Sequence, residues 1–342
     1  LRIPAAELGK ENPLPVFRRA RNEDISVGSR LPEEERRYIG WEIGYRILPH
    51  RLQDQYNRAL QPRTFRSIIL ENEILRATFL PELGGRLVSL YHKPSRRELL
   101  DRNPVFQPAN LALRNAWFSG GIEWNASQFG HHYLTCSPVF AARITGTRGE
   151  PALRIYEWDR VKCFPWQVDF HLPPGSPWLL AHVRLVNPHK ETIPMYWWTN
   201  MAVPETPGTR VLAPAETAVA NMPPNRLDVV DVASDETAAT YARCAQRARE
   251  YFFRIPEGVR PWVAAIQPNG KGFVQMSTAR LRGRKVFYWG MHGGGRRWQE
   301  FLSGPGHAYL EIQAGLARTQ LESVPMPGGK EWSWTEAFGA IE

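Results

Sequence analysis

The chain has 342 residues, 43% of them hydrophobic, which suits one large β-domain or two average domains and excludes a disordered protein. The formal net charge of +9 comes from scattered arginines without a nucleic-acid motif, so we expect no nucleic-acid partner. No apolar run approaches the roughly 18 residues that span a bilayer, so we expect no membrane segment. Cys136, Cys163 and Cys244 are odd in number and irregularly spaced, which excludes a disulfide framework or a zinc site and favours the cytoplasm.

The elements begin with a polar segment, residues 1–66, which we interpret as an N-terminal arm packed on the main domain. Within it, residues 31–37 fit either one helical turn or a solvated loop. From residue 67 to 342, short strands alternate with turns rich in Gly, Pro and Asn, which predicts an all-β domain with few helices. The predicted strands are 67–70, 73–80, 86–91, 153–158, 167–172, 178–187, 192–198, 262–267, 272–278, 285–289, 308–314 and 331–338.

Three segments interrupt this pattern. Residues 100–140 form a long, aromatic-rich loop, and such a loop inside a compact domain is usually functional. Residues 235–250 lack Gly and Pro and follow a plausible N-cap, Asp235, so they form the best helix candidate. Residues 291–297 contain three consecutive glycines without a P-loop ending or a dinucleotide fingerprint, so we expect a glycine-rich hairpin rather than a nucleotide site.

The strand near residues 309–315 carries a polar side. Tyr309, Glu311 and Gln313 share one face at period two, while Leu310 and Ile312 share the other. A half-buried strand normally points its polar face to water. Here the 13 tryptophans of the chain offer a second interpretation, because aromatic rings stack on sugars while carboxylates and amides bind hydroxyls. The pattern therefore favours a saccharide site.

Several stretches together resemble the galactose mutarotase-like superfamily, and most closely an uncharacterised bacterial branch that is often fused to tetratricopeptide repeats. The stretches are Leu80-Pro-Glu-Leu-Gly-Gly-Arg86, Ala116-Trp-Phe-Ser-Gly-Gly-Ile-Glu-Trp-Asn125, Tyr196-Trp-Trp-Thr-Asn200, Arg297-Trp-Gln-Glu-Phe-Leu302 and Leu310-Glu-Ile-Gln-Ala-Gly-Leu-Ala-Arg-Thr-Gln320. This resemblance covers nearly the whole chain. It implies a large antiparallel β-supersandwich that acts on or binds sugars.

The resemblance to true aldose 1-epimerases is weaker, and it implies both an agreement and a disagreement. Their Leu-Glu-x-Gln strand supplies the general base at the anomeric hydroxyl, so Glu311 inherits that role. Their Thr-Asn-His stretch supplies the general acid, but here the matching residue is Met201, which cannot donate a proton. Their His-Gly-Gly piece matches Ser119-Gly120-Gly121, again without the histidine. Both losses put plain mutarotation in doubt and favour a glycosidase-like mechanism.

Such a mechanism needs a second carboxylate across the sugar. We expect this to be Glu123, because an apolar indole, that of Trp124, would raise the pKa of its carboxyl as a general acid requires. The alternative is a loop carboxylate that pairs with Arg86 or Arg114. His131, directly after a glycine, is the third catalytic candidate and the substitute for a lost histidine.

Further polar and aromatic residues are expected to bind the mono- or oligosaccharide. They are Arg86, Trp124, Asn125, His132, Trp198, Asn200, Trp298, Gln313, Arg318 and Gln320. Each has a structural or surface role as its alternative, with core packing the default for a tryptophan. No ligand spacing indicates a metal, and no motif indicates a cofactor. The favoured function is glycosidase-like, with Glu311 as base or nucleophile and Glu123 as acid. The alternatives are an aldose 1-epimerase-like mutarotase and a non-catalytic sugar-binding module, and the oligomeric state is left open.

Overall fold

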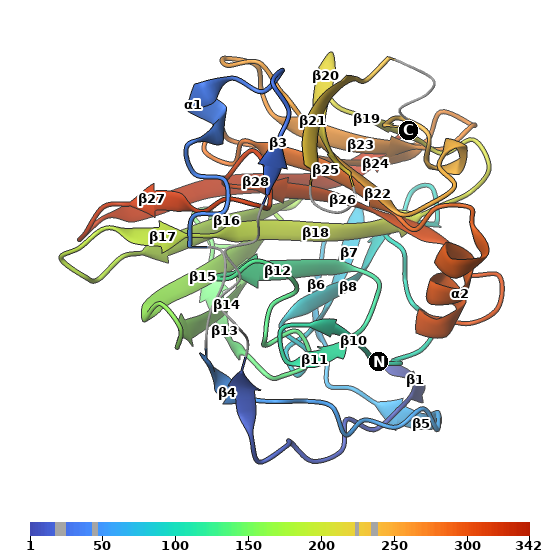
Figure 1. Cartoon of the computed structure of the whole chain (residues 1–342). Coiled ribbons are helices and arrows are strands. Elements are labelled where there is room, and N and C mark those ends of the chain that lie inside the picture. Colours follow the sequence, from blue (N-terminus) through green and yellow to red (C-terminus); the bar gives the residue numbers. More distant parts are fainter. Residues whose placement is uncertain (18–24, 43–46, 223–225, 234–238) are drawn as a thin grey trace.

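In a computed structural model of the chain, two antiparallel sheets pack face to face and carry most of the strands (Figure 1). The structure describes residues 1–17, 25–42, 47–222, 226–233 and 239–342. The large sheet has the spatial order β3 (Ser26–Val27), β21 (Arg226–Asp231), β20 (Thr217–Met222), β22 (Arg249–Phe253), β25 (Gly283–Tyr288), β26 (Tyr309–Gly315), β18 (Trp197–Pro204), β12 (Ile122–Ala126), β8 (Arg86–His92), β7 (Leu75–Leu80) and β6 (Ile68–Glu71), with β9 (Arg97–Glu98) beside β8.

The second sheet covers one face of the first. Its order is β13 (Phe140–Thr145), β14 (Pro151–Asp159), β15 (Phe164–His171), β16 (Trp178–Val186), β28 (Glu331–Ile341), β24 (Gly272–Ser277), β23 (Trp262–Ile266) and β19 (Arg210–Leu212). Four short ribbons complete the strands: β1 (Arg2–Ala5) with β5 (Gln61–Thr64), β2 (Pro15–Phe17) with β4 (Ile47–Arg51), β10 (Ala109–Ala112) with β11 (Asn115–Trp117), and β17 (Ile193–Met195) with β27 (Val324–Met326).

The main core lies between the two sheets and follows from period-two alternation. Along β16, alternate residues are buried from end to end, and these belong to the same core cluster as the apolar residues of β18 and β26. Met201 of β18 and Ile312 of β26 are paired in register and both belong to this core. The opposite side of β18 and β26 therefore faces away from the second sheet. That side is also covered, because every residue of β26 is buried, including its polar ones.

The described segments of residues 1–66 reach both ends of the molecule. Figure 1 shows β1, β4 and β5 at one end and α1 (Glu33–Arg36) with β3 at the other. β3 pairs in parallel with β21, and Leu31 packs over Trp198 and Phe252 on the large sheet. Of the two alternatives for residues 31–37, the structure shows the helical turn, and the segment around it covers part of the sheet face that carries the polar residues of β26.

The all-β class is confirmed. The helix expected within residues 235–250 and the hairpin expected within residues 291–297 are both wrong. Within residues 239–250, the described part of the expected helix, there is only a 3₁₀ turn (Ala242–Cys244) and the start of β22. Asp235 lies outside the described residues. The glycine-rich segment instead opens an α-helix, α2 (Gly293–Leu302), which His292 caps by accepting a hydrogen bond from the amide of Gly294 at 3.2 Å.

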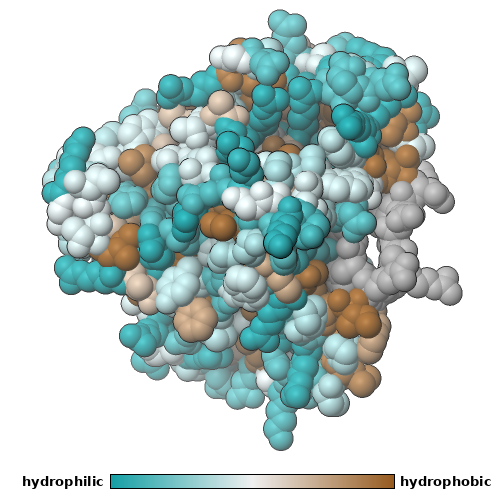
Figure 2. Space-filling model, turned by 90° about the vertical axis from the view of Figure 1, so that its left-hand side faces the viewer, coloured by the Kyte–Doolittle hydropathy of each residue, from teal (hydrophilic) through white to brown (hydrophobic). Residues whose placement is uncertain are grey.

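The outer surface carries no extended apolar area on the face shown in Figure 2. That face is the left-hand side of Figure 1, and hydrophilic residues predominate on it, with hydrophobic ones in small separate groups. In the described part of the chain, no helix is long and apolar enough to cross a membrane. The three cysteines are free, with Cys136 buried and the other two exposed.

Two glycines, Gly283 and Gly315, make room for the buried indole of Trp198, and this gives a test of the packing. Trp198 is fully buried, and a Cβ atom added at Gly315, its partner on β26, would lie 2.2 Å from the ring. We expect Gly315→Ala to destabilise the protein by about 1–3 kcal/mol through overpacking. Gly293→Ala is the matched control, because a Cβ atom there meets nothing within 4 Å. Urea denaturation measures both, and equal stabilities would contradict this packing.

Candidate functional site

Strand pairing gathers polar side chains on the side of the large sheet that faces away from the second sheet. Glu123 of β12 lies opposite Asn200 of β18, which lies opposite Gln313 of β26, which lies opposite Lys285 of β25. Residues directly opposite one another share a face, so these side chains form one row. Glu311, two residues before Gln313, lies on the same face. The predicted polar side of β26 is therefore confirmed, and it is not solvated.

Glu123 is a buried carboxylate surrounded by donors. Its Oε2 atom accepts hydrogen bonds from the indole of Trp117 at 3.1 Å and from Nδ1 of His131 at 2.9 Å. The guanidinium of Arg86 lies 3.7 Å from Oε1. Burial alone would raise the pKa of Glu123, but the charges of His131 and Arg86 and the two donors outweigh it and hold that pKa well below its usual range.

These surroundings favour the ionised form of Glu123, whereas the general acid expected from the sequence must carry a proton. The residue expected to raise its pKa, Trp124, points the other way. Its indole donates to the carbonyl of Gly85 at 3.1 Å and packs against Phe170 in the core between the sheets. The alternative that Glu123 pairs with Arg86 is the one that the structure shows.

Glu311 has the opposite electrostatic character. Its side chain accepts a hydrogen bond from the amide of Gln313 at 3.0 Å and is also hydrogen-bonded by Asn200. Burial raises the pKa of Glu311, and the negative charge of Glu123 raises it further, while His131, Lys285 and Asn200 only partly offset this. The two carboxyls thus have pKa values pushed apart by their surroundings, which is the arrangement that acid–base chemistry needs.

His131 is close enough for its charge to affect both carboxyls. Its ring packs 4.4 Å from that of Trp117, and its carbonyl accepts a hydrogen bond from the amide of Leu113 at 3.1 Å. The side chain is 25% exposed, against 3% for that of Glu123. Because Nδ1 is directed at Glu123, the other ring nitrogen is the one left to meet a ligand. His131 is the member of this group that connects it to solvent.

A chain of hydrogen bonds extends from Glu311 to a second ion pair. The side-chain oxygen of Gln313 accepts a hydrogen bond from the side-chain amide of Gln320 at 2.6 Å, and the side-chain oxygen of Gln320 accepts one from Lys285. Lys285 also lies 2.6 Å from a carboxylate oxygen of Glu250. Because Lys285 can only donate, it fixes both amides so that the Gln313 amide donates to Glu311. The sequence had indicated Gln313 and Gln320 but not Lys285 or Glu250.

Other predicted ligands hold the site together rather than line it. Arg86 is buried and donates to the carbonyl of Gly120 at 2.8 Å and to the hydroxyl of Thr135 at 2.6 Å. The side-chain oxygen of Asn125 accepts from the amide of His132 at 2.7 Å. Burial lowers the pKa of His132 to about 3, so this ring is neutral and packs against Tyr133. The choice of His131 over His132 agrees with this geometry.

Three further residues expected to bind the saccharide are buried or lie away from Glu311. Trp198 is on the same side of the large sheet as Glu311, but it is fully buried in a cluster with Leu31. Trp298 is on α2, 39% exposed and stacked 5.7 Å from Trp289. Arg318 pairs with Glu35 of α1 at 2.8 Å, away from Glu311. Met201 belongs to the core between the sheets, so the side of β18 that faces Glu311 presents Asn200 at that point and not a histidine.

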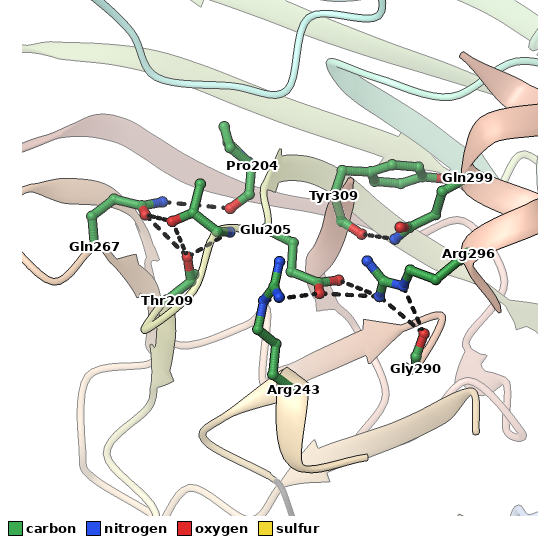
Figure 3. A network of polar contacts seen from close by, with 10 residues as sticks. Pro204, Glu205, Thr209, Arg243, Gln267, Gly290, Arg296, Gln299 and Tyr309 are labelled. Atoms are coloured by element: carbon green, nitrogen blue, oxygen red, sulfur yellow. Dashed lines mark hydrogen bonds and ion pairs between the residues drawn. The ribbon is translucent and has the colours of Figure 1, made fainter. Parts of the chain in front are cut away.

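A separate polar network fixes α2 beside the start of β26 (Figure 3). The buried carboxylate of Glu205 accepts from Arg296 at 3.0 and 3.2 Å, with Arg243 at 3.8 Å. The amide of Gln299 donates to the carbonyl of Tyr309 at 2.7 Å. The network therefore sets the position of the strand that carries Glu311. Trp298 is exposed on the same helix.

The fold is that of galactose mutarotase-like proteins, a β-supersandwich. Solved structures with this fold include a galactose mutarotase-like protein from Clostridium acetobutylicum, with TM-score 0.57, 10% identity, and coverage of 81% of this chain and 95% of that one. A galactose mutarotase related enzyme from Lactobacillus acidophilus aligns with TM-score 0.51, 12% identity, and coverage of 81% and 98%. At such identities the likeness concerns the fold.

The chain belongs to the DUF5107 family, described as a domain of unknown function, whose model matches residues 45–337. A TPR-domain containing protein from Parabacteroides distasonis aligns over 100% of this chain with TM-score 0.79 and 22% identity. The chain spans about half of that protein, 54% of its length. Both findings agree with the branch that the sequence resembles. Among the described residues, no group of three or more His, Cys, Asp or Glu is placed to hold a metal ion.

The pKa of Glu311 is raised and that of Glu123 is lowered. We therefore expect removal of each charge to change the stability of the protein in opposite directions. Glu311 has a raised pKa, so its ionised form is disfavoured by folding, and the resulting loss of stability sets in as pH rises above the ordinary 4.5. We expect Glu311→Gln to be more stable than the wild type at pH 7, with the difference vanishing below about pH 4. Thermal unfolding across pH 3–8 measures it.

Glu123→Gln is the matched comparison. Glu123 has a lowered pKa, so it contributes stability above pH 4.5 that is lost as pH falls toward its folded pKa. Because removing it leaves Arg86 buried without a carboxylate, we expect a loss of about 3–5 kcal/mol at pH 7. The same sign of change for both variants would contradict the electrostatics described above.

Proposed function

We propose that this protein binds an aldose and catalyses its anomeric interconversion, as an aldose 1-epimerase-like enzyme. The observation that carries this is the pair formed by Glu311, whose pKa is raised, and His131, whose Nδ1 is hydrogen-bonded to the ionised Glu123. Ring opening needs a base at the anomeric hydroxyl and an acid at the ring oxygen. The mutarotase-like fold of the two bacterial proteins above supports the same choice.

We assign a role to each group from its surroundings. Glu311 takes the proton of the anomeric hydroxyl, because a carboxylate with a raised pKa is the stronger base. His131 donates to the ring oxygen through its free ring nitrogen, and Glu123 stabilises the protonated imidazole. As the ring opens, the C1–O5 bond breaks and the C1 hydroxyl oxygen becomes the aldehyde oxygen. Reclosure on the other face returns both protons, so the reaction consumes no co-reactant.

His131 thus takes the acid role that Met201 cannot fill. The glycosidase-like mechanism that the sequence favoured requires a protonated carboxyl as acid. The surroundings of Glu123, which accepts two hydrogen bonds and lies beside Arg86, do not suit that role. Asn200 and Gln313, which both donate to Glu311, orient its carboxylate. Sugar hydroxyls would meet the partly exposed groups next to it, Phe287 and Gln320.

The test is anomeric exchange. Polarimetry of freshly dissolved α-galactose and α-glucose should show mutarotation faster than the buffer rate. We expect Glu311→Gln and His131→Asn each to lower the catalysed rate by about 10²–10⁴-fold, the usual contribution of general acid–base groups. Glu300→Gln is the matched control, because this glutamate is exposed on α2.

Two results would overturn the proposal. Wild-type protein that binds aldoses without accelerating exchange would be a sugar-binding module. Exchange that survives Glu311→Gln would place the base elsewhere. Saturation-transfer NMR with the same sugars distinguishes binding from turnover in one sample, and thermal unfolding shows that each variant is folded.

A further inference from the structure

A cavity of about 780 Å³ lies apart from Glu311, at one end of the sandwich. Its walls come from both sheets: Arg254 follows β22, Ser277 ends β24 and Thr335 lies on β28. The loop of residues 255–261 and Glu35 of α1 complete it. Glu311, Glu123 and His131 do not line it. The volume is within the range of about 300–1,000 Å³ that is typical of small-molecule sites.

The lining carries an excess of positive charge. It contains four arginines, Arg254, Arg260, Arg282 and Arg318, against the two carboxylates Glu35 and Glu257. The side chains of Arg282 and Arg318 are 54% and 47% exposed, so their guanidinium groups can meet a ligand. A concave site with a net charge of about +2 concentrates small anions.

One carboxylate already demonstrates how this cavity binds such a group. Glu35 accepts from Arg254 at 2.7 and 3.3 Å and lies 2.8 Å from Arg318. Arg254 is held in turn by donating to the hydroxyl of Thr217 at 3.2 Å. Burial alone would raise the pKa of Glu35, but the two arginines lower it below its ordinary value. The guanidinium groups are thus arranged to recognise a carboxylate or a phosphate.

A further cation lies behind the wall. Arg284 is fully buried and donates to the hydroxyl of Ser277 at 2.6 Å and to the carbonyl of Pro261 at 2.9 Å, both of which line the cavity. Its Nε atom is buried without a hydrogen-bond partner. Burial lowers the pKa of Arg284 to about 9, and the charge of Glu336 only partly offsets this. A buried cation whose hydrogen bonds go to neutral oxygens adds positive potential in front of it.

From these observations we propose that the cavity binds an organic anion of sugar size, whose carboxylate or phosphate group pairs with Arg282 and Arg318. Thr278 and Thr335 also line the cavity. The hydroxyl of Thr278 accepts from the backbone amide of Thr335 at 3.1 Å and that of Thr335 lies 3.1 Å from Nδ1 of His182, so each hydroxyl keeps capacity for one more hydrogen bond to a ligand. Val259 supplies apolar contact. Glu35 keeps its ion pair with Arg254, whose side chain is less exposed than that of Arg318. This pair holds the helical turn α1 over the cavity. This inference does not depend on the proposed epimerase activity.

Calorimetric titration at constant ionic strength tests it, with gluconate and sorbitol 6-phosphate as probes and sorbitol as the neutral reference, because none of these has the anomeric carbon on which the proposed active site acts. We expect Arg282→Gln and Arg318→Gln each to weaken binding of the anions by about tenfold, the loss of one charge-assisted hydrogen bond. Glu35→Gln should strengthen it, because a negative charge leaves the site. Glu311→Gln should leave it unchanged, which separates this cavity from the candidate active site.

The two anionic probes also identify the source of the charge. Binding of gluconate alone indicates a sugar acid, and binding of sorbitol 6-phosphate alone indicates a sugar phosphate. Equal affinity of the wild type and both arginine variants for each anion would overturn the proposal, as would weakened binding in Glu35→Gln. Arg282 is a safe variant for folding, because its pair with Glu257 is exposed on both sides.

Discussion

The antiparallel register of four central strands, β12, β18, β26 and β25, is the constraint on which the site depends. It places Glu123, Asn200, Gln313 and Lys285 in one line across the sheet, on the side that the second sheet does not cover. A slip of one residue in any pair would turn an acid or an amide into the core. The core on the other side, where Met201 and Ile312 pack, therefore fixes the chemistry as well as the fold.

Nearly complete burial makes the polar groups of this site strongly dependent on one another. Glu123 can stay charged only because Arg86 and His131 surround it, and its charge in turn disfavours ionisation of Glu311. At the other side, Lys285 sets the direction of two amides that end on Glu311. Glu311 and Glu123 are both glutamates. Their neighbouring residues, and not their residue type, therefore give them different pKa values.

Much of this could be predicted from the sequence, since period-two alternation is a local signal. It located strands in both large sheets and put Glu311 and Gln313 on one face. It missed β10, β11 and β12, which lie within residues 100–140, the segment expected to form a loop. The same rule explains the main error at the site: adjacent strand residues face opposite sides, so Glu123 and Trp124 could not both face it. The partner indole, Trp117, comes from a different strand and could be found only by knowing the pairing.

Other features depend on contacts between distant segments, which no local pattern reports. Residues 291–297 combine glycines with a capping histidine, and tertiary packing through Gln299 and Arg296 makes them part of a helix. Arg318 follows the Glu311 strand closely in sequence, but its partner is Glu35, which lies in the N-terminal arm. The candidate anion cavity was not predicted, because its arginines come from separated parts of the chain.

The position of β28 has a consequence for how the chain folds during synthesis. This strand follows all the others in sequence, yet it lies between β16 and β24 in the middle of the second sheet. Until residue 341 has left the ribosome, the two halves of that sheet have no strand to join them, and each exposes an unpaired edge. Contacts this distant in sequence also make folding slow. The incomplete chain would therefore spend its synthesis with two open sheet edges, a state in which chaperone binding is of most use.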